Sequence, residues 1–200
     1  MKKKLFSLAV VVICLSLLVG STWAYFTAEG TAHNVITSGT IGIEIIEKTL
    51  DGNGLEVKFP EEGIKNVMPG SVVSKIVRIA NVGEGDAWIR VKVDTTILSA
   101  DNQPLPTELD GKDGKIPVIT FTVEEGWTKG SDGYYYYNSP VSPTDDPKLF
   151  FNDVTFALEM GNAYQNSTAK VSICAEAVQS ANNAAPAGGV TAIQGWPEVK

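Results

Sequence analysis

The sequence predicts an all-β protein, an antiparallel jelly-roll-like β-sandwich that follows an N-terminal signal-peptide helix. Beyond residue 40, apolar residues alternate with polar ones in one segment after another, and none of these segments carries an apolar stripe with helical spacing. Short sequences rich in glycine, aspartate and asparagine separate the segments, as tight turns require. One apolar face per strand, repeated this often, is typical of antiparallel sheets packed on one another.

The clearest predicted strand runs from Ala87 to Asp94. Its odd-numbered residues are apolar, whereas its even-numbered residues are Trp88, Arg90, Lys92 and Asp94. The same period of two predicts further strands at 41–46, 119–123, 154–158 and 171–177. Turns are expected at 51–54, 69–70, 83–86, 110–114 and 132–133, and longer loops at 101–115 and 139–148.

The first 24 residues predict an export signal. Lysines at positions 2–4 precede an uncharged run at 5–19, and the small residues Thr22 and Ala24 occupy the third-last and last positions before the cut. Cleavage after Ala24 makes Tyr25 the first residue of the mature chain. The alternative is an uncleaved leader that tethers the protein to a membrane, because an apolar run of about 20 residues can span a bilayer.

Size and charge narrow the functional classes. Removing 24 of the 200 residues leaves 176, enough to bury one core without metals or disulfides. Loss of the three leader lysines takes the net charge from −7 to −10, and an acidic chain repels nucleic acids and anionic membranes. We therefore expect no nucleic-acid partner, and contact with a membrane only before the leader is cleaved.

Residues 25–37 are predicted to form an N-terminal arm. Residues 38–181 are predicted to form the sandwich domain. If the arm is extended, small or apolar residues occupy one face and mostly polar residues the other. This pattern predicts a strand that can slide into a groove of another sheet; an ordinary first strand or a frayed end is the alternative. The residues expected to enter the groove are Phe26, Ala28, Gly30, Ala32, Asn34 and Ile36, with Tyr25 at the start.

The C-terminal residues 182–200 are rich in alanine and glycine. They predict a loose tail, with Trp196 and Pro197 docking back onto the domain.

Residues that could carry catalysis are scarce. His33 is the one histidine of the chain, and Cys174 is the one cysteine left after the leader. This inventory predicts no catalytic residues, no metal site, no cofactor and no internal disulfide. Because Cys174 lies in an alternating run, we expect a buried, inert thiol, with a cross-link between two copies as the alternative.

Several loops carry clusters of acidic residues that could bind calcium. Residues 51–62 begin like a calcium loop, but Leu55 and Glu56 interrupt the ligand pattern, so a β-turn is expected. Weak calcium binding at Asp145–Asp146, or at Asp110 with Asp113, stays an alternative.

The tyrosines at 134–137 predict a cross-strand aromatic ladder with Trp127, in which two tyrosines enter the core and two face water. The alternative is a platform that stacks against carbohydrate.

Several motifs in order resemble the TasA/camelysin family of exported bacterial proteins. They are Thr22-Trp23-Ala24, Tyr25-Phe26, Ser38-Gly39-Thr40, Met68-Pro69-Gly70-Ser71, Ile79-Ala80-Asn81-Val82-Gly83, Trp88-Ile89-Arg90-Val91, Trp127, Asp132-Gly133 with the tyrosine run, and Ala175-Glu176-Ala177-Val178-Gln179. The resemblance implies a jelly-roll sandwich, cleavage by a dedicated signal peptidase, and secretion to the extracellular matrix or cell surface of a Gram-positive-type bacterium. It also implies a structural role in biofilm-matrix fibres.

In fibres of this family, the N-terminal strand of one subunit is thought to complete the sheet of the next, which matches the two-faced arm at 26–36. The expected partners are therefore the signal peptidase and other copies or related fibre subunits. Some relatives carry a metalloendopeptidase label, but the usual ligands are missing here, so we expect no enzyme. A cell-surface metalloendopeptidase and a monomeric surface-binding module are the alternative functions.

Overall fold

The computed structural model describes residues 33–34 and 41–197. Within this part of the chain the strands form a seven-stranded sheet, a five-stranded sheet and a separate two-stranded hairpin, β8 (Glu108–Gly111) with β9 (Gly114–Pro117). The seven-stranded sheet, here sheet A, runs β1 (His33–Asn34), β14 (Thr168–Gln179), β6 (Ala87–Leu98), β12 (Tyr135–Tyr137) and β11 (Trp127–Lys129), with β4 (Ile64–Lys65) on β14 and β7 (Pro104–Leu105) on β6. The five-stranded sheet, here sheet B, runs β10 (Ile119–Thr120), β13 (Lys148–Phe156), β5 (Val72–Asn81), β2 (Ile43–Leu50) and β3 (Glu56–Lys58).

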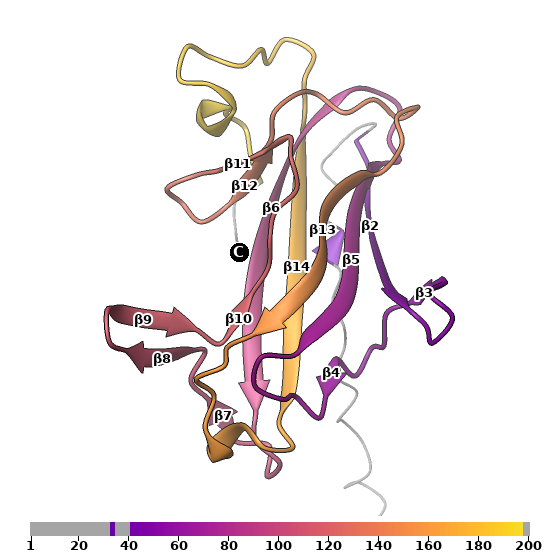
Figure 1. Cartoon of the computed structure of the whole chain (residues 1–200). Helices are drawn as coiled ribbons and strands as arrows, with labels where there is room; N and C mark the ends of the chain where they lie inside the picture. Colours follow the sequence, from indigo (N-terminus) through magenta and orange to yellow (C-terminus); the bar gives the residue numbers. More distant parts are fainter. Residues whose placement is uncertain (1–32, 35–40, 198–200) are drawn as a thin grey trace, which may run out of the picture.

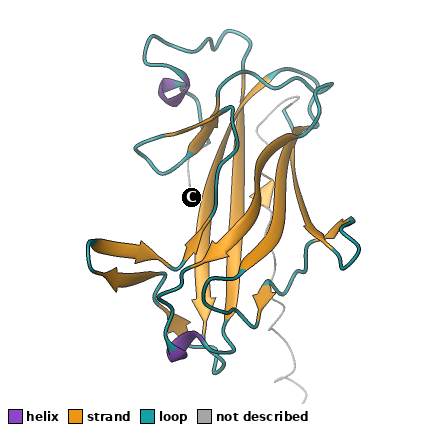
Figure 2. Cartoon of the chain, in the orientation of Figure 1, coloured by secondary structure: helices purple, strands orange, loops and turns teal. Residues whose placement is uncertain are grey.

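The two sheets pack face to face, and the predicted all-β sandwich is confirmed (Figure 1). Figure 2 shows that helix in the described part is limited to two short turns, η2 (Asn162–Tyr164) and η3 (Val190–Ala192). One hydrophobic core lies between the sheets and draws on strands of both, for example Ile43, Val77, Val91, Phe156 and Ile173. Burial of these apolar side chains is the main favourable term in folding.

Strands β6 and β14 form the spine of sheet A. They pair antiparallel without interruption from Thr168 opposite Leu98 to Gln179 opposite Ala87. The predicted alternation of β6 is confirmed, because Ile89 and Val91 enter the core whereas Trp88 and Arg90 lie on the outer face. The outer face of sheet A therefore carries the polar and aromatic side chains.

Three sequence predictions about elements need correction. Residues 101–115 are not a plain loop, because β7, β8 and the first half of β9 lie there. The strand expected at 119–123 is paired only as β10, although Ile119, Phe121 and Val123 all contact the core. Strand β5, ten residues long, was not predicted.

The predicted turn at 51–54 is confirmed. The Asp51 carboxylate accepts hydrogen bonds from the backbone N–H groups of Asn53 (2.8 Å) and Leu55 (2.9 Å), and these bonds lower the pKa of Asp51. Gly54 adopts a positive φ of 78°, which glycine tolerates best. The first acid of the calcium-like sequence is thus committed to the turn.

The predicted leader at 1–24 and its cleavage site lie outside the described residues. In the part of the chain that the model describes, no helix is long and apolar enough to cross a membrane.

Candidate functional site

The outer edge of β14 is the candidate site. One edge of this twelve-residue strand is fully paired with β6. On the opposite edge, the described pairing partners are β4, at Thr168 and Ala169, and β1, at Cys174 and Ala175. Among the described residues, β4 and β1 are only two residues long each. The backbone pairing of such short strands contributes little to the stability of the sheet.

Strand β1 pairs with β14 in the parallel sense. His33 lies opposite Cys174 and Asn34 opposite Ala175. Every other strand pairing among the described residues is antiparallel. Residues 35–42 connect β1 to β2 in sheet B, so the N-terminal segment passes from one sheet of the sandwich to the other.

The face of β14 that enters the core presents small and branched apolar residues: Ala169, Val171, Ile173, Ala175 and Ala177. Across the sandwich, β2 contributes Ile43 and Ile45. Parallel strands give evenly spaced backbone hydrogen bonds, and side chains on alternate positions face the core. A segment added to the β14 edge therefore gains backbone hydrogen bonds on one side and apolar contacts on the other.

The structure locates part of the predicted arm. His33, which the sequence places on the polar face, and Asn34, which it places on the groove face, lie in β1. The other predicted donor residues and the processing residues lie outside the described part of the chain: Thr22, Ala24, Tyr25, Phe26, Ala28, Gly30, Ala32 and Ile36.

Cys174 was predicted to be buried, but it is only half-buried. It lies on the outer face of sheet A together with Glu176. Its thiol is free. Burial raises the pKa of the Cys174 thiol, and the negative charges of Glu176 and Asp94 raise it further. A raised pKa reduces the thiolate fraction at neutral pH, which agrees with the predicted inert thiol.

Metal-ligating side chains are dispersed in the described part of the chain. No three histidine, cysteine, aspartate or glutamate side chains there come together as a metal site would require. At the two calcium alternatives, Asp110 pairs with Lys115 and Asp145 pairs with Lys148.

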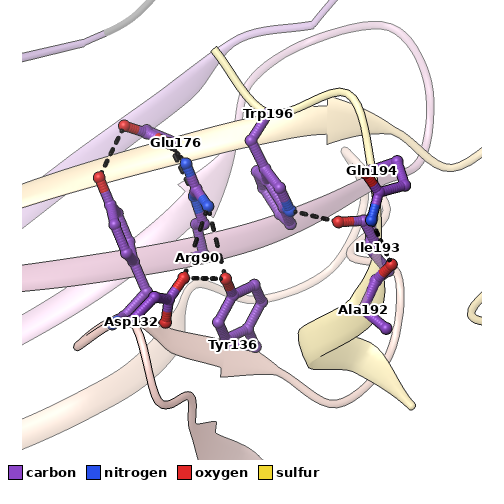
Figure 3. Close-up of polar contacts among 9 residues, drawn as sticks. Arg90, Asp132, Tyr136, Glu176, Ala192, Ile193, Gln194 and Trp196 are labelled. Carbon is purple, nitrogen blue, oxygen red and sulfur yellow. Dashed lines mark hydrogen bonds and ion pairs between the residues drawn. The ribbon is translucent and has the colours of Figure 1, made fainter. Parts of the chain in front are cut away.

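A buried polar cluster lies on the outer face of sheet A, around Arg90 of β6 (Figure 3). The Arg90 Nη2 atom lies 2.6 Å from Glu176 Oε2 on β14, and Arg90 Nε donates to the same oxygen at 2.7 Å. Tyr134 donates to Glu176 Oε1 at 3.2 Å, and Tyr136 donates to Asp132 at 2.6 Å. The cluster thus ties β6, β12 and β14 together through charge-assisted hydrogen bonds.

The pKa values of the cluster follow from its burial and its charges. Burial alone would lower the pKa of Arg90, but hydrogen bonds to Tyr136 and Glu176 outweigh it and raise the pKa above the usual value. Burial, with the Glu176 charge, raises the pKa of Tyr134 to about 12. Both groups are therefore held in their protonated forms at neutral pH.

The tyrosine run is arranged partly as predicted. Tyr137 pairs with Trp127 across β11 and β12, with ring centroids 5.0 Å apart, so the cross-strand ladder is confirmed. Tyr135 and Tyr137 pack against the core. The other two tyrosines, Tyr134 and Tyr136, were predicted to face water. They are buried instead, because Arg90 and the C-terminal segment cover them.

The chain is similar to a known protein family over its N-terminal half. The family model described as camelysin metallo-endopeptidase matches residues 1–110, more than half of the chain. The match includes the predicted leader and arm together with β2, β5 and β6, but it ends before the tyrosine run and β14. No curated protein matches the chain, and no solved structure matches it. The chain belongs to the camelysin family, as the TasA/camelysin motifs of its sequence predicted.

Proposed function

We propose that this chain is an exported structural subunit that assembles into extracellular biofilm-matrix fibres. In this proposal a signal peptidase removes residues 1–24, and the released arm from Tyr25 to about Ile36 pairs with the β14 edge of another copy or of a related subunit. The single observation that carries the proposal is the placement of β1, parallel to β14 at Cys174 and Ala175.

The chemistry of the β14 edge supports strand addition. An extended segment that joins an exposed sheet edge gains affinity from backbone hydrogen bonds and specificity from alternate side chains. The arm carries small or apolar side chains on alternate positions, and β14 turns a row of alanine, valine and isoleucine toward the core. The arm of any copy can make the same contacts, because every copy carries the same arm and the same edge.

The connection between the arm and the sandwich is long enough for exchange. Residues 35–42 separate β1 from β2, and eight extended residues span up to about 27 Å. A contact between unlike surfaces of identical copies, here an arm and an edge, generates an open filament when it does not close into a ring. The leader would hold the arm at the membrane until cleavage, which would delay assembly until after export.

A cysteine pair in register tests the proposal. His33→Cys places a second thiol opposite the native Cys174, and neighbouring strands lie about 4.8 Å apart, within the reach of a disulfide. Oxidised fibres of this variant should give a ladder of covalent multimers on a non-reducing gel, and reduction should collapse the ladder. Fibres that contain only internally linked monomers would show that each arm stays on its own sheet.

Two matched variants serve as controls. Asn34→Cys shifts the thiol by one residue, and adjacent residues of a strand face opposite sides of the sheet, so its cross-linking to Cys174 should be weak. His33→Cys combined with Cys174→Ser removes the partner thiol and should abolish the ladder.

Deleting Tyr25 to Val35 provides an independent test. The truncated mature chain should remain folded and monomeric by size-exclusion chromatography, and electron microscopy should show no filaments. Filaments formed by this truncated chain would contradict donation from the N-terminal end.

The family description also raises metal-dependent peptide hydrolysis as a second function. Among the described residues the donor set that a peptidase metal requires is not assembled, so we derive no hydrolytic step. Incubating the mature protein with casein, with and without a chelator, distinguishes the two functions. Chelator-sensitive cleavage would support the peptidase; intact casein is the expected result.

A further inference from the structure

The C-terminal segment 182–197 folds back over the outer face of sheet A (Figures 1 and 3). Ile193, which is 3% exposed, packs with Trp88 of β6 and Val178 of β14 in a small cluster separate from the main core. The Trp196 ring lies over the Arg90 guanidinium at 4.6 Å and meets Tyr136 edge-on at 5.7 Å. Ile193 and Trp196 therefore make the main contacts of the segment with the sheet and are called its anchors, and Val190 packs beside them.

The surface under these anchors is built without them. Arg90 already has Glu176 as its ion-pair partner and the Tyr134 ring at 4.0 Å, and these groups come from the sheet and from the turn that leads into β12. The Trp196 ring adds a second aromatic contact to the guanidinium. Arginine, tyrosine and tryptophan are the residues that dominate the energy of protein interfaces. The surface thus has the composition of a preformed binding site.

The segment is held mainly by side-chain packing. The Trp88 indole N–H donates to the Asn183 carbonyl oxygen at 2.7 Å, and Ser180 donates to the Asp86 carbonyl oxygen. After Asn183, the hydrogen bonds recorded for the described residues of the segment stay within it, for example from Trp196 Nε1 to the Ile193 oxygen at 2.9 Å. Few interactions must break for the anchors to leave the sheet.

The stretch between Asn183 and the anchors is short of bulky side chains. Residues 184–189 are Ala-Ala-Pro-Ala-Gly-Gly, and six extended residues span up to about 20 Å. This distance allows the anchors of one copy to reach a copy beside it.

We propose that the Arg90 face of sheet A is a peptide-binding site, and that its occupant in assemblies is the C-terminal segment of a second copy. The exchanged segment makes the same contacts as the chain's own segment, so exchange costs little, as in domain swapping. Between subunits already held side by side, the effective concentration of neighbouring segments is high. The proposal needs two copies only and does not depend on the N-terminal arm.

A peptide titration tests the binding site. Ile193→Ser with Trp196→Ser in the full chain removes the anchors and leaves the sheet surface unchanged. A fluorescent peptide of residues 182–200 should bind this anchor variant saturably, and at least tenfold more weakly to the unaltered chain, whose own segment competes. The control is the same peptide with both serines, which should not bind. Equal binding of the two peptides, or none by either, would overturn the site.

Mixing two complementary variants tests the exchange. Trp88→Ser with Val178→Ser damages the site but keeps the anchors, and circular dichroism checks that this site variant folds. Monomers of the anchor variant and the site variant should form a one-to-one dimer by analytical ultracentrifugation, whereas each alone stays monomeric. If the anchor variant binds the peptide but the mixture contains no dimer, the site serves only its own chain and exchange between copies is wrong.

Discussion

The two long sides of the sandwich, where the edges of sheet A and sheet B meet, are closed in different ways. On one side, aromatic rings from β11, β12 and β13 interlock. Trp127 meets Phe150 edge-on with ring centroids 4.9 Å apart, and Tyr135 meets Phe150 at 5.3 Å. The Trp127 indole N–H also donates to the Leu149 carbonyl oxygen at 2.9 Å, so one side chain joins the two sheets.

The opposite side has a different composition. There β14 of sheet A pairs with β1, which also contacts β2 of sheet B. The described residues on this side include an ion pair at 2.6 Å between Nζ of the buried Lys75 and Oε1 of the half-buried Glu47. The Phe59 ring covers the Lys75 ammonium at 3.8 Å. Burial lowers the pKa of Lys75, although the Glu47 charge opposes this effect.

The difference indicates at which side of the molecule we expect the proposed exchange between copies. The aromatic side is closed by residues in the middle of the chain, so opening it means unpacking the core. The β14 side is closed by β1, near the start of the chain, and in the proposed exchange this strand leaves while the sandwich stays folded. The aromatic side should therefore govern stability, and the β14 side should govern assembly.

The largest effect expected is from Phe150→Ala on the aromatic side. Phe150 is fully buried against four other rings, so its removal should lower the free energy of unfolding by about 3–5 kcal/mol. The matched change Phe59→Ala on the β14 side should cost at least about 1.5 kcal/mol less, because Phe59 is only half-buried. Urea unfolding measures both, and equal losses would erase the contrast between the sides.

A second prediction concerns Tyr134, which joins the aromatic hairpin to Glu176 of β14. Its pKa is raised from 10.0 to about 12, so above pH 10 the unfolded chain loses this proton before the folded chain does. The raised pKa comes mainly from burial of the phenol and then from the Glu176 charge. The stability linked to the protonated phenol is fully present below pH 10 and is lost as the pH rises through 12, a loss of roughly 3 kcal/mol. Between pH 9 and pH 11.5, Tyr134→Phe should lose about 2 kcal/mol less than the unaltered chain in urea unfolding. Parallel pH curves would contradict the assignment.

Removal of the arm should have a small effect on stability. Deletion of Tyr25 to Val35 takes away the described pairing of two residues, His33 and Asn34, so the expected cost is about 1–2 kcal/mol. Thermal unfolding of the truncated chain, compared with Phe150→Ala, measures the difference. A loss as large as that of Phe150→Ala would mean that the arm belongs to the core of its own subunit.

Ionic strength should have the mildest effect, on the rate of assembly alone. Mature subunits with a net charge of −10 repel one another, and salt or mild acid weakens that repulsion. Fibre growth followed by light scattering should therefore accelerate with added salt. A rate that depends on neither salt nor pH would show that charge does not limit the encounter of subunits.

The strands that were predicted well are those whose pattern is local. Alternation along β6 and β14 identified both the strands and their core faces, because each residue's side follows from its position alone. Strand β5 was missed because Lys75 lies on the same face as the buried Val77 and Ile79 and interrupts the apolar alternation. The charge of Lys75 is compensated by Glu47, which is 28 residues away on another strand. A partner at that distance leaves no signal in the local sequence.

The candidate sites also differ in how much of each could be predicted from local sequence. The two-faced arm could be recognised from its own residues, but the strand that receives it could not, since the order of strands in sheet A is a property of the fold. The Arg90 cluster was missed because Arg90 and Glu176 are 86 residues apart and meet only through the β6–β14 register. Glu176 inside an otherwise apolar run was the one clue available.

The pairing of β1 with β14 has a consequence for any polymer built through it. An arm and a sheet edge are unlike surfaces, so every subunit in such a polymer points the same way. One terminus of the fibre then presents an unfilled edge, and the other presents an arm with no acceptor. The two termini should grow at different rates, which time-resolved imaging of single fibres can measure.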